Sequence, residues 1–66
     1  MEDWQQRVIE EKNELEVKAT ALHYFIANNK QFKKIEWEEQ QRLVRQSEIM
    51  WSYLQILKDR IDAFKK

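Results

Sequence analysis

The chain of 66 residues contains no cysteine, no glycine and no proline, and it has a single histidine. Without cysteine it can form no disulfide, no thiolate zinc site and no cysteine nucleophile. The lone His23 cannot build a histidine-rich metal site, so we expect no metal and no cofactor. The chain also lacks the run of ~20 apolar residues that crosses a membrane, and its charged first seven residues are unlike a signal peptide. These absences favour a location in the cytoplasm, away from membranes.

Apolar residues recur at helical spacing in both halves of the chain, and no glycine or proline interrupts either series. The second half alternates steps of four and three residues: Leu43, Ser47, Met50, Leu54, Leu57, Ile61 and Phe64. The first half repeats every seven residues at Val8, Leu15 and Leu22, with Trp4, Ala19, Phe25 and Ile26 on the same side. Such spacing is typical of helices packed on helices. It predicts an all-α fold, a helical hairpin of two long antiparallel helices.

Local signals divide the single domain, residues 1–66, into a first helix over about 3–27, a link over 28–36 and a second helix over about 37–64. Asp3 is a reasonable N-cap for the first helix. Asn28 and Asn29 predict its end, because asparagine tolerates the left-handed cap conformation. Within the link, Phe32 and Ile35 are spaced to point inward as a short helical turn.

The second helix carries more apolar surface than one partner helix can cover. If its stripe packs on the first helix, five further apolar residues must face something else: Val44, Ile49, Trp51, Tyr53 and Ile56. A chain this short also sits near the lower size limit for a self-sufficient core. We therefore predict a homo-oligomer, with a hexamer as the expected form, and a lipid or ligand groove as the alternative use of this surface.

Charge is balanced overall but unevenly divided. Residues 1–28 hold six acids against three bases, and residues 29–66 hold six acids against nine bases. This division favours attraction between antiparallel halves. Binding of duplex DNA usually needs a clear basic excess, so we expect no polymeric nucleic acid as partner, and any phosphate ligand should be small.

No catalytic set can be assembled from the sequence. A ferritin-like metal site needs histidine three residues after glutamate on a core-facing helix, and no such pair occurs, so Glu10, Glu11, Glu14 and Glu16 predict a solvated helix face. His23 lies among apolar and aromatic neighbours and is expected at the edge of the core. The chain also has no glycine-rich phosphate loop. We predict that it is not an enzyme.

Aromatic and basic residues of the first helix remain as a candidate binding set: Trp4, Arg7, Lys12 and Lys18. An indole stacks on a base and a cationic side chain binds phosphate. The alternative is that Trp4 plugs the end of the core and the bases pair with glutamates four residues away. Trp4 and Lys18 share a helix face but lie roughly 21 Å apart along the axis. If both hold one small ligand, they must come from different subunits.

The sequence also resembles a known family along essentially its whole length. The most specific segments are the opening over residues 4–12, which reads Trp-Gln-Gln-Arg-Val-Ile-Glu-Glu-Lys, and the ending Met-x-x-Tyr-x-x-x-Leu-x-x-Arg-Ile over residues 50–61. These segments resemble the anti-CBASS cyclic-oligonucleotide sponges of phages, the second anti-CBASS protein family. This chain has Trp4 where that family carries tyrosine, which keeps a stacking surface. It has Trp37 where the family often has proline, which affects only the start of the second helix.

The resemblance implies a compact homohexamer in the host cell cytoplasm that binds cyclic dinucleotides such as 3′,3′-cGAMP and, in some members, cyclic trinucleotides. Binding would withhold the messenger from the host defence. The family's roles carry over to Trp4 for stacking and Lys18 for phosphate binding, with Thr20 and Arg60 as weaker candidates for a second, trinucleotide site. The competing hypothesis is a structural, self-assembling adaptor that binds a protein through Trp51, Tyr53 and Ile56.

Overall fold

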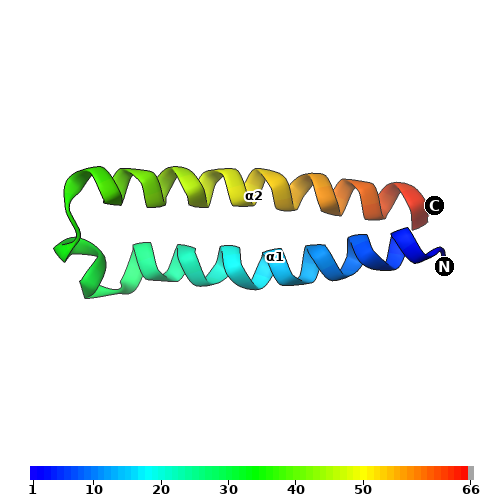
Figure 1. Cartoon of the computed structure of the whole chain (residues 1–66), viewed down its shortest axis with the longest axis horizontal. Helices are drawn as coiled ribbons and strands as arrows, with labels where there is room; N and C mark the ends of the chain where they lie inside the picture. The colour runs from blue at the N-terminus through cyan, green and yellow to red at the C-terminus, as the bar shows by residue number, and fades with distance from the viewer. Residues whose placement is uncertain (66) are drawn as a thin grey trace.

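The computed structural model describes residues 1–65 and shows one helical hairpin (Figure 1). Helix α1 spans Asp3–Asn28, a short 3-10 helix η1 spans Lys30–Lys34, and helix α2 spans Trp37–Lys65. The two long helices run antiparallel, so both ends of the chain lie at the same end of a rod of 46 × 15 × 15 Å. No strand occurs within residues 1–65. The predicted all-α hairpin is confirmed.

Both ends of α1 differ in detail from the prediction. The N-cap is Glu2 and not Asp3: the Glu2 backbone N–H donates to Gln5 Oε1 at 2.7 Å, as in a capping box. At the other end Asn29 is extended, with φ −88° and ψ 126°, so the predicted left-handed cap was wrong. The Asn29 side chain instead accepts a 2.8 Å bond from the Gln31 N–H and begins η1. Asparagine ends the helix here by bonding locally to the next turn.

The link is tied to both long helices. Phe32 packs edge-on against Phe25 of α1, with ring centres 6.0 Å apart. From α2, the Gln40 side chain donates to the carbonyl oxygens of Phe32 at 3.0 Å and Ile35 at 2.8 Å. Phe32 and Ile35 are both half-buried, in keeping with the inward orientation expected from their spacing. These contacts set how far α2 slides along α1, which in turn decides which side chains meet across the hairpin.

The core is one narrow seam between the two helices. Its buried members come from both predicted stripes: Val8, Ala19, Ser47, Leu54, Leu57 and Ile61. Leu54 and Leu57 are the largest fully buried side chains, and burying each is worth about 1.5–3 kcal/mol. Within residues 1–65 one ion pair, Glu16 to Lys58 at 3.7 Å, joins the helices, and both partners are about 40% exposed. Such a pair contributes ~1 kcal/mol at most. Apolar packing therefore holds the hairpin together.

The single chain leaves a large surface uncovered. Its accessible area is 5286 Å², against about 4,500 Å² expected for a compact monomer of this mass. Ile49, Tyr53 and Ile56 are each more than two-fifths exposed on α2. Trp51 is turned to another side of the helix, where it contacts His23, because residues two positions apart differ by about 160° in direction. The five apolar residues that we expected to act as one group are thus divided, and Val44 among them is already half-buried.

Candidate functional site

Three contacts between the helices distinguish two long sides of the hairpin. On one side Trp4 of α1 meets Phe64 of α2, with ring centres 5.4 Å apart in an edge-on arrangement. On the other side Glu16 pairs with Lys58, and His23 contacts Trp51. We call the first the Trp4 side (Trp4, Arg7, Lys18, Arg60 and Phe64) and the second the lysine side (Ile9, Lys12, Glu16, Lys58, Asp62 and Lys65).

Trp4 lies in the first turn of α1, at the open end of the hairpin where α2 ends. Phe64 holds one part of the indole, but 52% of the residue stays exposed. The contact with Phe64 agrees with the alternative that Trp4 plugs the end of the core, and stacking on a base stays a prediction. The ring closes the end of the seam, and it also keeps surface on which another ring can stack.

Arg7 and Arg60 lie near Trp4 on the same side. Arg7 is one turn along α1 from Trp4, and Arg60 is one turn along α2 from Phe64, and side chains at such spacings are neighbours on a helix. Arg7 pairs with Asp3 at 3.5 Å, with both side chains about four-fifths exposed or more. The sequence alternative expected glutamates four residues away: Lys12 does pair with Glu16, at 3.4 Å, but Arg7 pairs with an aspartate. The Arg7–Asp3 pair is highly exposed. It is weak enough to be displaced by a ligand phosphate.

Lys18 projects from the middle of α1. It is exposed, and no carboxylate of residues 1–65 is paired with it. It shares the Trp4 side, but 14 residues of straight helix separate it from Trp4, or roughly 21 Å. A single chain therefore does not bring the two residues together.

Thr20 does not join the other candidate residues. It is half-buried and lines a shallow hollow on the surface of α1 with Asn13, Glu16, Val17 and Ala21. Thr20 follows Lys18 by two residues in α1, so its side chain points about 160° away from that of Lys18. Thr20 and Arg60 thus lie on different sides of one hairpin.

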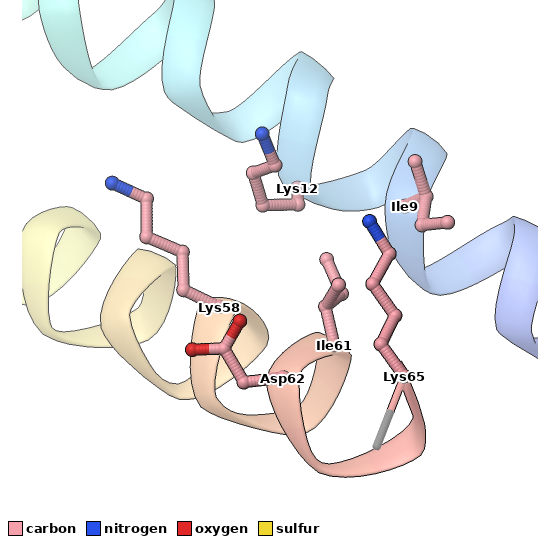
Figure 2. A pocket seen from close by; sticks show the side chains of 6 residues that line it. All are labelled: Ile9, Lys12, Lys58, Ile61, Asp62 and Lys65. Atoms are coloured by element: carbon pink, nitrogen blue, oxygen red, sulfur yellow. The ribbon is translucent and has the colours of Figure 1, made fainter.

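The lysine side holds a hollow that the sequence did not reveal. A cavity of about 350 Å³ opens between the helices, lined by Ile9, Lys12, Lys58, Ile61, Asp62 and Lys65. Figure 2 shows Ile9 and Lys12 projecting from α1 and the other four side chains from α2, with Lys65 extending toward α1. Lys58 and Lys65 are seven residues apart, so their common face was readable from the sequence. Whether these two lysines lie near Lys12 depends on how far α2 slides along α1.

Comparison with known proteins identifies the family. The sequence profile described as Sequestin matches residues 2–63, nearly the entire chain. The chain belongs to the Sequestin family. No curated protein and no solved structure gave a significant match. The family's name fits the resemblance to phage anti-CBASS sponges that the opening and ending segments carry, and it indicates sequestration rather than catalysis.

Within residues 1–65 no three carboxylate or imidazole side chains are grouped as they would be around a metal ion. Neither helix, over the same residues, has a segment long and apolar enough to cross a membrane.

Glu10, Glu11 and Glu14 are exposed, as expected for a solvated face, whereas Glu16 is half-buried between two lysines. His23 is exposed at the edge of the seam, between the rings of Tyr24 and Trp51.

Proposed function

We propose that this Sequestin protein is a non-enzymatic sponge that binds cyclic dinucleotides of the 3′,3′-cGAMP type and withholds them from the host CBASS defence in the host cell cytoplasm. The observation that carries the proposal is the family match over residues 2–63. It agrees with the resemblance to phage sponges in the Trp4–Lys12 opening and the Met50–Ile61 ending. Such a protein acts stoichiometrically: no bond is broken, and its capacity depends on copy number and on the dissociation rate of the ligand.

The Trp4 side supplies the chemistry that a cyclic dinucleotide requires. Its bases offer flat π-faces, and the exposed part of the Trp4 indole can stack on one of them for about 1–3 kcal/mol. Its two phosphates need cations that are free to bind. Lys18 is unpaired among the described residues, and Arg7 is held only by an exposed ion pair. A charge-assisted bond from Lys18 to a phosphate oxygen is the second expected anchor.

Because Trp4 and Lys18 lie far apart on one chain, we expect a ligand pocket that is shared between subunits. A ligand that uses both residues must take Trp4 from one subunit and Lys18 from another, across an antiparallel pair of α1 helices. A closed homo-oligomer would repeat this pocket by symmetry, and we expect a hexamer. The exposed Ile49, Tyr53 and Ile56 of α2 offer the apolar surface for such an assembly. In that assembly Thr20 and Arg60, which one chain keeps apart, are the candidates for a second site that takes cyclic trinucleotides.

Calorimetry with a panel of cyclic di- and trinucleotides tests the proposal. Linear dinucleotides of the same bases are the matched control, because a sponge should reject them and a nonspecific basic patch should not. Trp4→Ala should weaken binding of 3′,3′-cGAMP by about 1–3 kcal/mol through lost stacking. Binding of linear and cyclic forms with equal affinity, or of neither, would contradict the proposed function.

A mixed oligomer tests whether the pocket is shared. Neither Trp4→Ala nor Lys18→Ala alone should bind well. When the two variants are co-assembled, some pockets join an intact Trp4 from one chain with an intact Lys18 from the other. Partial binding should then return. If a verified mixed oligomer of folded subunits regains no binding, the two residues do not act across a subunit boundary.

The alternative is an adaptor that self-assembles and binds a protein. The exposed Ile49, Tyr53 and Ile56 favour it, although Trp51 cannot belong to the same surface. An adaptor of this kind would bind no cyclic nucleotide in the calorimetric panel. If the protein is an adaptor, Ile56→Asp should abolish binding of the protein partner. If it is a sponge, the same variant should lose assembly, which light scattering measures.

A further inference from the structure

Three lysines line the hollow on the lysine side. Lys12 comes from α1, and Lys58 and Lys65 come from α2, about two turns apart (Figure 2). The Lys12 side chain is only 25% exposed, so its position is largely set by packing before any ligand arrives. Ile9 and Ile61 form the apolar part of the lining, next to the core.

The acids nearby do not neutralise these lysines fully. Glu16 serves two of them at once, with Lys12 at 3.4 Å and Lys58 at 3.7 Å. Both distances exceed the range of about 2.7–2.9 Å that is typical of strong charge-assisted hydrogen bonds. Lys65 has no paired carboxylate, and Asp62 no paired cation, among residues 1–65. Counting Glu16 and Asp62 against the three lysines leaves the hollow with one net positive charge, close to apolar side chains that strengthen its field.

We propose that this hollow is an anion site that binds a phosphate monoester of mononucleotide size. Its volume of about 350 Å³ is at the lower end of the range for small-molecule sites, roughly 300–1,000 Å³. Ammonium groups suit a phosphate as point charges, and the two isoleucines suit an apolar ring or sugar face. The site lies on the opposite side of the hairpin from Trp4 and Lys18. It is formed within one chain and goes beyond the cyclic dinucleotide pocket without depending on it.

Nuclear magnetic resonance with AMP and with inorganic phosphate as probes locates the site directly. Amide shifts in the full-length protein should change over residues 9–12 and 58–65 and leave Lys30–Lys34 unchanged. AMP should bind more tightly than inorganic phosphate, because only AMP can also contact Ile9 and Ile61. Shift changes confined to other segments, or spread evenly over all lysines, would overturn the proposal.

Variants of matched charge sharpen the test. Lys12→Gln and Lys65→Gln should each weaken AMP binding about tenfold, since each removes one of the three cations. Lys30→Gln makes the same change of charge at the far end of the hairpin and should have no comparable effect. Equal losses from all three variants would show long-range charge alone and would contradict a site in the hollow.

Glu16 supplies a test in the opposite direction. Glu16→Gln frees Lys12 and Lys58 from their shared carboxylate and should tighten AMP binding about threefold. Glu11→Gln, the same change at an exposed position of the Trp4 side, should leave affinity unchanged. Retention of 3′,3′-cGAMP binding by Lys65→Gln, and of AMP binding by Lys18→Ala, separates this site from the proposed sponge pocket. Weaker AMP binding in Glu16→Gln would argue against competition between the Glu16 carboxylate and the AMP phosphate for these lysines.

Discussion

The two sides of the hairpin use similar residues in different arrangements. On the Trp4 side, an exposed indole lies roughly 21 Å from Lys18, which has no paired carboxylate among residues 1–65, and the proposed pocket takes the two residues from different subunits. On the lysine side, Lys12, Lys58 and Lys65 line one hollow within a single chain. The comparison shows that charge composition alone says little about binding. Whether basic residues form a complete site depends on whether they lie along one helix or face each other across two.

The largest expected effect concerns the core that both sides share. Leu57→Ala removes a fully buried side chain and should lower the free energy of unfolding by about 2–5 kcal/mol. Chemical denaturation measures this change. The adjacent Ile56, which is 57% exposed in one chain, supplies the comparison: Ile56→Ala should cost less than ~0.5 kcal/mol at concentrations where the chain is monomeric, and more where the proposed oligomer covers it. A loss at Ile56 as large as that at Leu57 would show that another surface covers Ile56 in solution.

The next prediction compares the two sides as ligand sites. Lys18→Ala should weaken binding of 3′,3′-cGAMP by about 1–3 kcal/mol, because a charge-assisted phosphate contact is lost. Lys12→Ala should leave that affinity within about 0.5 kcal/mol, since Lys12 lies on the other side of the hairpin. Calorimetry on folded variants measures both. An equal loss in the two variants would mean that the assembled pocket draws on both sides.

A smaller effect is expected from the aromatic contact that closes the Trp4 side. The edge-on pair of Trp4 and Phe64 should contribute a coupling energy of about 0.5–1.5 kcal/mol to stability. A double-mutant cycle with Trp4→Ala and Phe64→Ala measures it by thermal or chemical unfolding. Additive single effects would indicate that Trp4 leaves Phe64 in solution and is free to meet a ligand without cost to the hairpin.

The smallest effects are expected from the ion pairs, one on each side. The Asp3–Arg7 pair is highly exposed and should show a coupling energy of about 0–0.5 kcal/mol. The Glu16–Lys58 pair joins the helices beside the hollow and should show up to about 1 kcal/mol, decreasing as salt is raised. Double-mutant cycles at low and high ionic strength provide both values. A larger coupling at Asp3–Arg7 would reverse the expected order of the two sides.

Much of the fold was predictable from the sequence. The alternating steps from Leu43 to Phe64 identified the buried face of α2, and Leu54, Leu57 and Ile61 are indeed buried there. Details that depend on local bonding were not predictable. Asn29 ends α1 with an extended backbone because its side chain bonds to Gln31, an arrangement that residue type alone does not distinguish from a left-handed cap.

The candidate sites divide in the same way. The sequence marked Trp4, Arg7 and Lys18 as residues on one helix, and their spacing along α1 follows directly from helix geometry. It did not mark the hollow, since Lys12 is 46 positions from Lys58 in the chain. It also grouped Trp51 with Tyr53, whereas the contact with His23 turns Trp51 to the lysine side.

The residue pattern was sufficient for the helices and for the seam between them, because helix periodicity assigns each residue a direction around its own axis. Membership in the Sequestin family also followed from the sequence, which matches the family over residues 2–63. Periodicity says nothing about how far one helix slides along the other. That register follows from η1, from the bonds of Gln40 to the link and from the packing of Leu54 and Leu57. This register places Phe64 against Trp4 and lets Lys12 of α1 line the same hollow as Lys58 and Lys65 of α2. Both arrangements exist only in the folded chain.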